Sequence, residues 1–172
     1  MEENKQKVID QDDLYDEEDD EDAQKDKFLT FTVGKEDYGI EIIHVTEIVG
    51  IQKITEVPDM PRYVKGVINL RGKVIPVMDV RRRFQLEDRD YDDRTCIVVV
   101  SINSTAVGLV VDKVREVSDI PPSQIEPPPN VSEGNRQQYI KGLGKVEEEV
   151  KILLDTEKLL YSDAEALTQI SA

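Results

Sequence analysis

The fold is decided by the stretch Val64-Lys65-Gly66-Val67-Ile68-Asn69-Leu70-Arg71-Gly72-Lys73-Val74-Ile75-Pro76-Val77-Met78-Asp79. It contains two apolar runs, 67–70 and 74–78, separated by a short polar turn. Gly72 lies in that turn, where a hairpin needs a residue that accepts a positive φ angle. Pro76 lies inside the second run, and proline has no backbone N–H to donate to a neighbouring strand. We therefore expect a β-hairpin whose second strand lies at a sheet edge or a bulge.

Short apolar segments of the same style precede and follow this hairpin. Residues 28–33 and 38–42 are rich in β-forming residues and predict a hairpin with a four-residue loop. Residues 95–102 form a nearly continuous apolar run, as in a strand that is buried on both faces. A last hairpin is expected from residues 139–146 and 150–154.

The segments between these strands predict less regular structure. Apolar residues at helical spacing predict about one and a half helical turns over residues 43–49. Residues 51–57 predict a short strand, and Gly108 is expected to break the long apolar segment 105–117. Residues 118–138 contain two proline clusters and predict a loop.

The strand count indicates an all-β protein. We expect about nine or ten short strands, mainly antiparallel, with small helices between them. Strands this short usually close into small barrels, because closure removes unpaired sheet edges. Two small barrels of about 70 residues each fit the length of the chain, 172 residues, better than one large barrel.

The two ends of the chain differ from its middle. Residues 1–27 hold 13 of the 37 acidic side chains and 4 basic ones, so −9 of the net charge of −15 lies there and −6 in the rest. This segment offers little apolar surface to bury, and we expect a disordered acidic tail. Residues 161–172 are expected to be a C-terminal tail, helical at most. The acidic balance disfavours nucleic-acid binding, which needs clustered Lys and Arg.

Cysteine use and hydropathy indicate a cytoplasmic protein. Cys96 is the one cysteine of the sequence, so no intramolecular disulfide can form. No apolar run approaches the roughly 20 residues that a membrane span needs. The acidic N-terminus is also the reverse of a secretory signal peptide.

Catalytic, metal and cofactor sites are not expected. The one histidine, His44, is three residues before Glu47, and the two could supply two ligands of a metal ion. No further residues with ligand spacing complete such a site. Cys96 lies in an apolar strand and is expected to be a small core residue. With one His and one Cys, no catalytic triad or dyad is supplied. Three arginines, 81–83, are expected to form a solvated helical turn after Asp79 as N-cap. An OB-type nucleic-acid binder would need exposed aromatic residues in a basic groove, and this chain has no Trp and 3 Phe.

Several motifs keep the order and spacing of one family. They are Phe28-Leu29-x-Phe31 with Tyr38-Gly39-Ile40, Gly66-Val67-x-Asn69-Leu70-Arg71-Gly72-x-Val74-x-Pro76-Val77-x-Asp79, Val107-Gly108-Leu109-Val110-Val111-Asp112, and Gly142-Leu143-Gly144 ahead of Ile152-Leu153-Leu154-Asp155. In these motifs the sequence resembles the CheW family of chemotaxis coupling proteins, over about residues 28–160.

The resemblance implies a fold and a function. The fold would be two intertwined five-stranded SH3-like barrels with short helices, packed across a shared apolar core in a CheW-like domain over 28–160. The function would be a non-catalytic scaffold that holds the regulatory domain of the histidine kinase CheA and the cytoplasmic tip of methyl-accepting chemoreceptors. Such a protein is cytoplasmic and is recruited to membrane-bound receptor arrays. A regulatory-domain-like β-barrel adaptor of another two-component pathway is the alternative.

The resemblance also implies a receptor-binding groove between the barrels. Aliphatic side chains would contact a receptor helix, a glycine would allow close approach, and Glu47 and Arg71 could pair with each other or with the partner. The alternative is that the aliphatic side chains are simply core and that the ion pair contributes under about 1 kcal/mol. The residues that contact the kinase are not assigned. The predicted receptor-binding residues are Ile42, Glu47, Ile48, Arg71, Val107 and Gly108.

Overall fold

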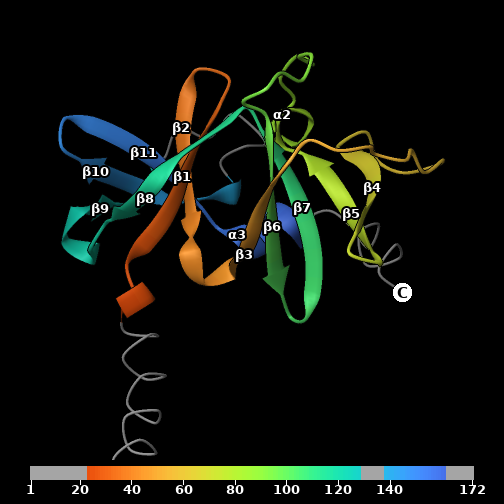
Figure 1. Cartoon of the computed structure of the whole chain (residues 1–172). Helices are drawn as coiled ribbons and strands as arrows, with labels where there is room; N and C mark the ends of the chain where they lie inside the picture. The colour runs from red at the N-terminus through yellow and green to blue at the C-terminus, as the bar shows by residue number, and fades with distance from the viewer. Residues whose placement is uncertain (1–22, 129–137, 162–172) are drawn as a thin grey trace, which may run out of the picture.

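The computed structural model describes residues 23–128 and 138–161, whose strands form two sheets that lie beside each other (Figure 1). The first sheet has the order β8-β1-β2-β11-β10-β9 and the second β3-β6-β7-β5-β4. Within the described residues, no helix is long and apolar enough to cross a bilayer. The elements are β1 (Lys27–Val33), β2 (Glu36–Glu41), η1 (Ile42–His44), β3 (Val45–Gly50), β4 (Val64–Leu70), β5 (Lys73–Asp79), α2 (Val80–Arg83), β6 (Cys96–Ile102), β7 (Thr105–Val111), β8 (Lys113–Asp119), η2 (Pro122–Gln124), β9 (Ile125–Glu126), β10 (Ile140–Val146), β11 (Glu149–Leu154) and α3 (Thr156–Tyr161).

The two sheets are interleaved in sequence. The first takes strands from both ends of the described chain, and the second takes the five strands between them. The chain leaves the first sheet after β2 and returns to it at β8, which directly follows β7 of the second sheet. Each sheet therefore contains one parallel pair, β2 with β11 and β5 with β7, among antiparallel neighbours. The second sheet is thus inserted in the chain between two parts of the first, which agrees with the prediction of intertwined halves.

The alternation of side chains along β6 explains why its sequence is apolar throughout. Val98 and Val100 belong to a large cluster that includes residues of both sheets. Ile97 and Val99 point the other way, into a cluster formed by the second sheet alone. A third cluster, around Phe28, lies within the first sheet. Because successive residues of a strand face opposite sides, a strand between two cores has no polar face.

One edge of the second sheet, the outer side of β4, is covered by a neighbouring segment. Thr55 exchanges two backbone hydrogen bonds with Val67 on the outer edge of β4, both of 2.9 Å. Gly66 makes this approach possible, since a Cβ there would lie 2.1 Å from the Thr55 carbonyl oxygen. In the first sheet the edge strands β8 and β9 are joined by the short η2. The all-β prediction is confirmed, and the arrangement agrees with two SH3-like barrels around a shared core. The first sheet has six strands, because the two-residue β9 is added.

The prediction that β5 lies at an edge was wrong, although its physical basis holds locally. β5 lies between β4 and β7. Pro76 is opposite Val67, whose backbone groups bond to Thr55 and not to β5. The ladder between β5 and β7 begins one residue later, at Val77. Pro76 therefore occupies a position where neither neighbouring strand needs its N–H.

The helix predicted over 43–49 is limited to the single 3-10 turn η1, and the rest of the segment is strand. η1 ends at His44 and β3 follows directly. A bulge at Thr46 interrupts the strand alternation, and the apolar residues then fall at spacings that also suit a helix. The strand expected over 51–57 was wrong as well, since Thr55 alone makes a bridge there.

Two further boundaries differ from expectation. Gly108 lies inside an unbroken β7, and the chain instead changes sheets at Asp112. The expected loop 118–138 contains the end of β8, η2 and β9, and its residues 129–137 lie outside the described residues. The first hairpin has a two-residue loop where we expected four residues.

Other local predictions are confirmed. The hairpins β4–β5 and β10–β11 form, and the Asp79 carboxylate accepts from the backbone N–H of Arg81 at 2.9 Å at the start of α2. Arg83 in α2 is buried, whereas we expected a solvated turn. Residues 1–22 and 162–172 lie outside the described residues, so both predicted tails stay predictions.

Candidate functional site

Glu47 and Arg71 lie at opposite edges of the second sheet and form an ion pair with each other. Glu47 belongs to β3, one edge strand, and Arg71 to the turn between β5 and β4, the other edge strand. The pair therefore joins the two edges where the sheet curls round. The Arg71 side chain is 72% exposed and that of Glu47 27% exposed, so this pair can also contact another protein.

The turn holds Arg71 in an unusual backbone conformation. Its φ is 51° and that of Gly72 is 84°, as in the two-residue turns that match the twist of a hairpin. The Asn69 side-chain oxygen accepts a 2.9 Å hydrogen bond from the Gly72 N–H and fixes the turn. Arg71 is therefore presented by a rigid turn, which reduces the entropy lost when a partner binds it.

Ile48 is the exposed end of an apolar row. The strand register places Ile48 beside Val98, then Leu109, then Met78. The last three are buried in the cluster shared by both sheets, whereas Ile48 is 43% exposed at the free edge of β3. Ile48 thus continues the apolar surface of the core onto the outside at the free edge of β3, and the side chain of its neighbour Glu47 alternates to the other side of the strand.

The other three predicted residues lie inside. Val107 is fully buried in the shared cluster, and Ile42 packs against the same cluster from η1. Gly108 is buried too, and a Cβ on it would lie 2.7 Å from Cγ2 of Ile97. The missing side chain of Gly108 thus makes room for the protein's own core. Of the six predicted residues, the structure brings Glu47, Ile48 and Arg71 to the surface. Val107 and Gly108 are buried, and Ile42 is partly buried.

His44 and Cys96 have structural surroundings. His44 and Glu47 do not share a helical face; Nε2 of His44 lies 3.5 Å from a carboxylate oxygen of Glu41. In the part of the chain that the structure describes, no three His, Cys, Asp or Glu side chains are grouped to hold a metal ion. Cys96 is partly buried, packs against the shared cluster and donates from Sγ to the Arg94 carbonyl at 3.3 Å.

Sequence reasoning missed the ion pair at the junction of the sheets. Asp112, between β7 and β8, accepts two 2.8 Å hydrogen bonds from Arg81 and one of 2.8 Å from the backbone N–H of Gly34. Burial alone would raise the pKa of Asp112, but these hydrogen bonds outweigh it and lower that pKa. A single acid between two apolar strands was the available signal for this site.

Arg83 was also missed. Its guanidinium lies 4.2 Å from the ring centroid of Tyr63 and 4.8 Å from that of Tyr139, and its Nε donates to the Leu159 carbonyl at 2.9 Å. Tyr63 directly precedes β4 of the second sheet, Tyr139 precedes β10 of the first sheet, and Leu159 lies in α3. Arg83 therefore connects the two sheets. Its position as the last of three consecutive arginines gave no signal of burial.

Groups with a shifted pKa belong to internal networks. Fully buried Lys151 bonds to Asp37 at 2.8 Å and to Glu149 at 2.7 Å. Burial by itself would lower the pKa of Lys151, yet the two carboxylates raise it. Burial and a 2.7 Å bond to Asp79 raise the pKa of Tyr91. Ion pairs account for the shift of Lys151, and burial with a hydrogen bond accounts for that of Tyr91, so structural contacts explain both.

Comparison with known proteins identifies the relatives of this chain. The model of the CheW-like domain family matches residues 27–164. A chemotaxis protein CheW of Klebsiella aerogenes is 40% identical over 141 residues, which cover 82% of this chain and 85% of that protein. That of Bacillus subtilis is 33% identical over 139 residues, covering 81% and 89% of the two chains. The crystal structure of the scaffolding protein TtCheW from Thermoanaerobacter tengcongensis superposes with a TM-score of 0.75 at 34% identity, over 82% of this chain and 96% of that one.

Proposed function

The chain belongs to the CheW-like domain family of chemotaxis coupling proteins, and we propose that it is a non-catalytic scaffold between methyl-accepting chemoreceptors and the histidine kinase CheA. In this proposal it binds the cytoplasmic tip of the receptors and the regulatory domain of the kinase, and is recruited from the cytoplasm to receptor arrays. The observation that carries the receptor side is the surface formed by Ile48, Glu47 and Arg71, named the β3-edge surface below.

The chemistry of the β3-edge surface suits a helical partner. A receptor helix that docks in a groove presents an apolar stripe with polar residues on both sides. Ile48 offers an uncovered apolar side chain that continues the buried core. Glu47, the preceding residue of β3, and its partner Arg71 offer one charge of each sign at the same edge strand, with the Glu47 side chain on the other side of the strand. Arginine, which can donate two parallel hydrogen bonds to a carboxylate, is one of the residue types enriched among the few contacts that dominate binding.

Charge reversal at Arg71 tests the proposal. We expect Arg71→Glu to weaken capture of a receptor-tip fragment by about tenfold, because an arginine at the centre of an interface commonly contributes that much. The fold should survive, since an exposed ion pair contributes under about 1 kcal/mol. Binding is measured by titration calorimetry, and folding by urea unfolding. The matched control is Lys73→Glu, which changes an exposed residue of the same hairpin by the same charge.

A charge swap separates two roles of the pair. In Glu47→Arg combined with Arg71→Glu, the ion pair can reform with its polarity reversed. If Arg71 contacts the receptor, the double variant stays weak in binding. If the pair only closes the sheet, the double variant recovers. Normal capture by a folded Arg71→Glu protein would contradict the proposal for this surface.

The coupling role is tested with all three components. Receptor, CheA and this chain together should give faster kinase autophosphorylation than any two of them. The chain alone should bind the CheA regulatory domain without a receptor. A regulatory β-barrel of another two-component pathway, the alternative, would bind neither CheA nor the receptor fragment.

A further inference from the structure

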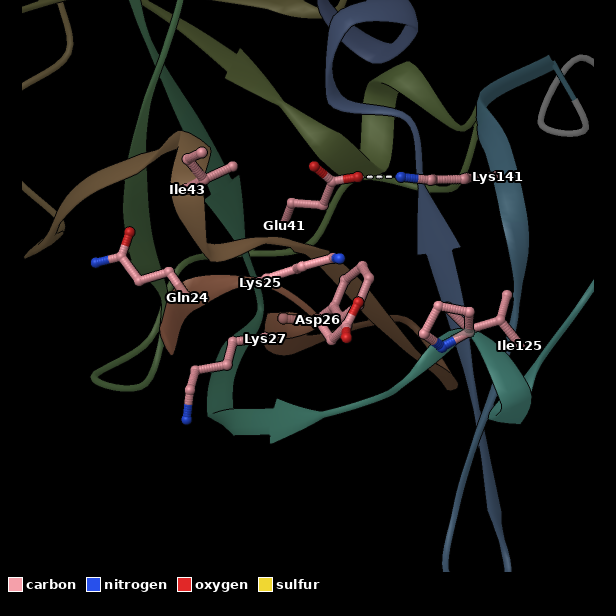
Figure 2. A pocket seen from close by; sticks show the side chains of 10 residues that line it. Gln24, Lys25, Asp26, Lys27, Glu41, Ile43, Ile125 and Lys141 are labelled. Carbon is pink, nitrogen blue, oxygen red and sulfur yellow. Dashed lines mark hydrogen bonds and ion pairs between the residues drawn. The ribbon is translucent and has the colours of Figure 1, made fainter. Parts of the chain in front are cut away.

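A groove of about 630 Å³ lies where the start of β1, η1, and the η2–β9 connection meet (Figure 2). Its apolar lining includes Phe28, Ile43 and Ile125, which come from these three elements. Ile43 is 59% exposed, among the least covered large apolar side chains of the described residues. Water-exposed apolar surface of this kind is stabilised when another segment covers it.

The lining of this groove carries three lysines and two carboxylates, Asp26 and Glu41, so its net charge is +1 on an acidic protein. Lys25 and Lys141 point toward the middle of the groove, and Lys141 pairs with Glu41 there (Figure 2). Lys27, the third lysine of the lining, points away from the middle (Figure 2). The groove therefore fits a segment that combines apolar side chains with negative charge.

The chain itself supplies such a segment directly upstream. Residues 1–22 hold 12 acidic and 2 basic side chains, so they account for −10 of the net charge of −15. Within them, Leu14 and Tyr15 stand next to the uninterrupted acidic run Asp16–Asp22. We propose that this N-terminal segment docks in the groove, with Leu14 and Tyr15 against the apolar lining and the acidic run against Lys25 and Lys141.

Tethering favours this occupant over a separate protein. Gln24 lines the groove, and Tyr15 precedes it by nine residues, which reach about 30 Å when extended. A segment held this close acts at an effective concentration in the millimolar range, so weak contacts suffice. Docking would cover Ile43, which immediately precedes His44 and β3. Because the attraction between the acidic run and the lysines is electrostatic, this cover would weaken as the salt concentration rises. This inference does not depend on the proposed receptor or kinase partners.

The test uses the full chain with a nitroxide on Gln11→Cys, in a Cys96→Ser background. Serine can keep the bond that Cys96 donates to the Arg94 carbonyl. We expect strong paramagnetic broadening of the Ile43 and Ile125 amide signals, and none at Val74 in the second sheet. Raising the salt from 0.1 M to 1 M should remove most of it, because the Debye length falls from about 10 Å to about 3 Å.

Paired neutral variants decide whether the groove is the site. Lys25→Gln with Lys141→Gln should reduce the broadening at Ile43 by about threefold, as expected for the loss of two exposed ion pairs. The control is Lys53→Gln with Lys73→Gln, which removes the same charge away from the groove. It should leave the broadening at Ile43 unchanged.

Three outcomes would overturn the proposal. One is equal reduction by both pairs of variants. Another is broadening confined to the residues next to the tether, 23–28. The third is broadening that appears when labelled and isotope-enriched chains are mixed, since it would assign the groove to a second copy.

Discussion

The protein contains two arginine–carboxylate pairs that look alike in sequence and differ in surroundings. Arg81 and Asp112 are 17% and 12% exposed and lie where the chain passes from one sheet to the other. Arg71 and Glu47 lie at the rim of the second sheet, with the arginine 72% exposed. Asp112 also accepts a backbone hydrogen bond from Gly34 in the first hairpin, so three separate segments meet at one carboxylate.

The difference separates a structural role from a binding role. A buried charge that loses its partner is strongly destabilising, because its desolvation is no longer compensated. An exposed pair contributes little to stability, so its residues can contact a partner at small cost to the fold. We therefore assign the junction pair to holding the two sheets together and the rim pair to partner binding.

The largest effect is expected at the junction. Asp112→Asn keeps the shape and an acceptor for Gly34 but leaves Arg81 without a counter-charge. We expect it to lower the free energy of unfolding by about 2–3 kcal/mol. Urea unfolding followed by circular dichroism measures this loss. Glu47→Gln is the matched control and should cost under about 1 kcal/mol. Equal losses in the two variants would remove the distinction between the pairs.

Gly108 tests whether a residue of the predicted site belongs to the core. Gly108→Ala places a Cβ against Cγ2 of Ile97, and we expect a loss of about 1–3 kcal/mol from overpacking. Ile97→Leu removes Cγ2, so the double variant should recover part of that loss. The measurement is a double-mutant cycle of unfolding free energies. If Gly108→Ala is fully stable and only receptor binding falls, then Gly108 faces the partner after all.

Turn chemistry and single-strand patterns were predictable from the sequence, because they depend on neighbouring residues. Gly72 and Asp79 made their predicted turn and cap, and Asn69 supports the turn by a contact within three residues. The apolar run of β6 also revealed its two buried faces. The segment 43–49 was misread, because the bulge at Thr46 depends on pairing with β6, which lies fifty residues away in the chain.

The candidate site was predictable in its charges and less so in its burial. Opposite charges on Glu47 and Arg71 suggested the pair that the structure contains. Val107 and Gly108 lie in an apolar strand, and sequence alone does not say which face another strand covers. Asp112 marks the end of the apolar run 105–111, but one aspartate does not show that the chain changes sheets there. The cause of this change is tertiary, since the carboxylate bonds to Arg81 and Gly34.

The pH dependence should sharpen the contrast between the two pairs. Burial tends to raise the pKa of Asp112, but its hydrogen bonds hold it below the ordinary value of 3.8. A lowered pKa in the folded state contributes stability that is present above 3.8 and is lost as pH falls through the folded-state value. The stability gap between the wild type and Asp112→Asn should therefore be constant from pH 7 to pH 5 and should shrink below pH 4. Urea midpoints at four pH values measure it, and a gap that persists at pH 3 would contradict this account.

The smallest effect on stability is expected at Ile48. Its side chain is 43% exposed, and Ile48→Thr keeps the β-branch that suits an edge strand. We expect a change in unfolding free energy within about 0.5 kcal/mol, as for other surface substitutions. Receptor-tip binding should weaken by about fivefold, because the apolar contact beside the rim pair is lost. Val150→Thr, an equally exposed β-branched residue of the first sheet, is the control and should change neither quantity. If Ile48→Thr lowered the free energy of unfolding by more than about 2 kcal/mol, Ile48 would belong to the core together with Val98, Leu109 and Met78. The Glu47–Arg71 pair would then be the only part of the β3-edge surface left to bind a partner.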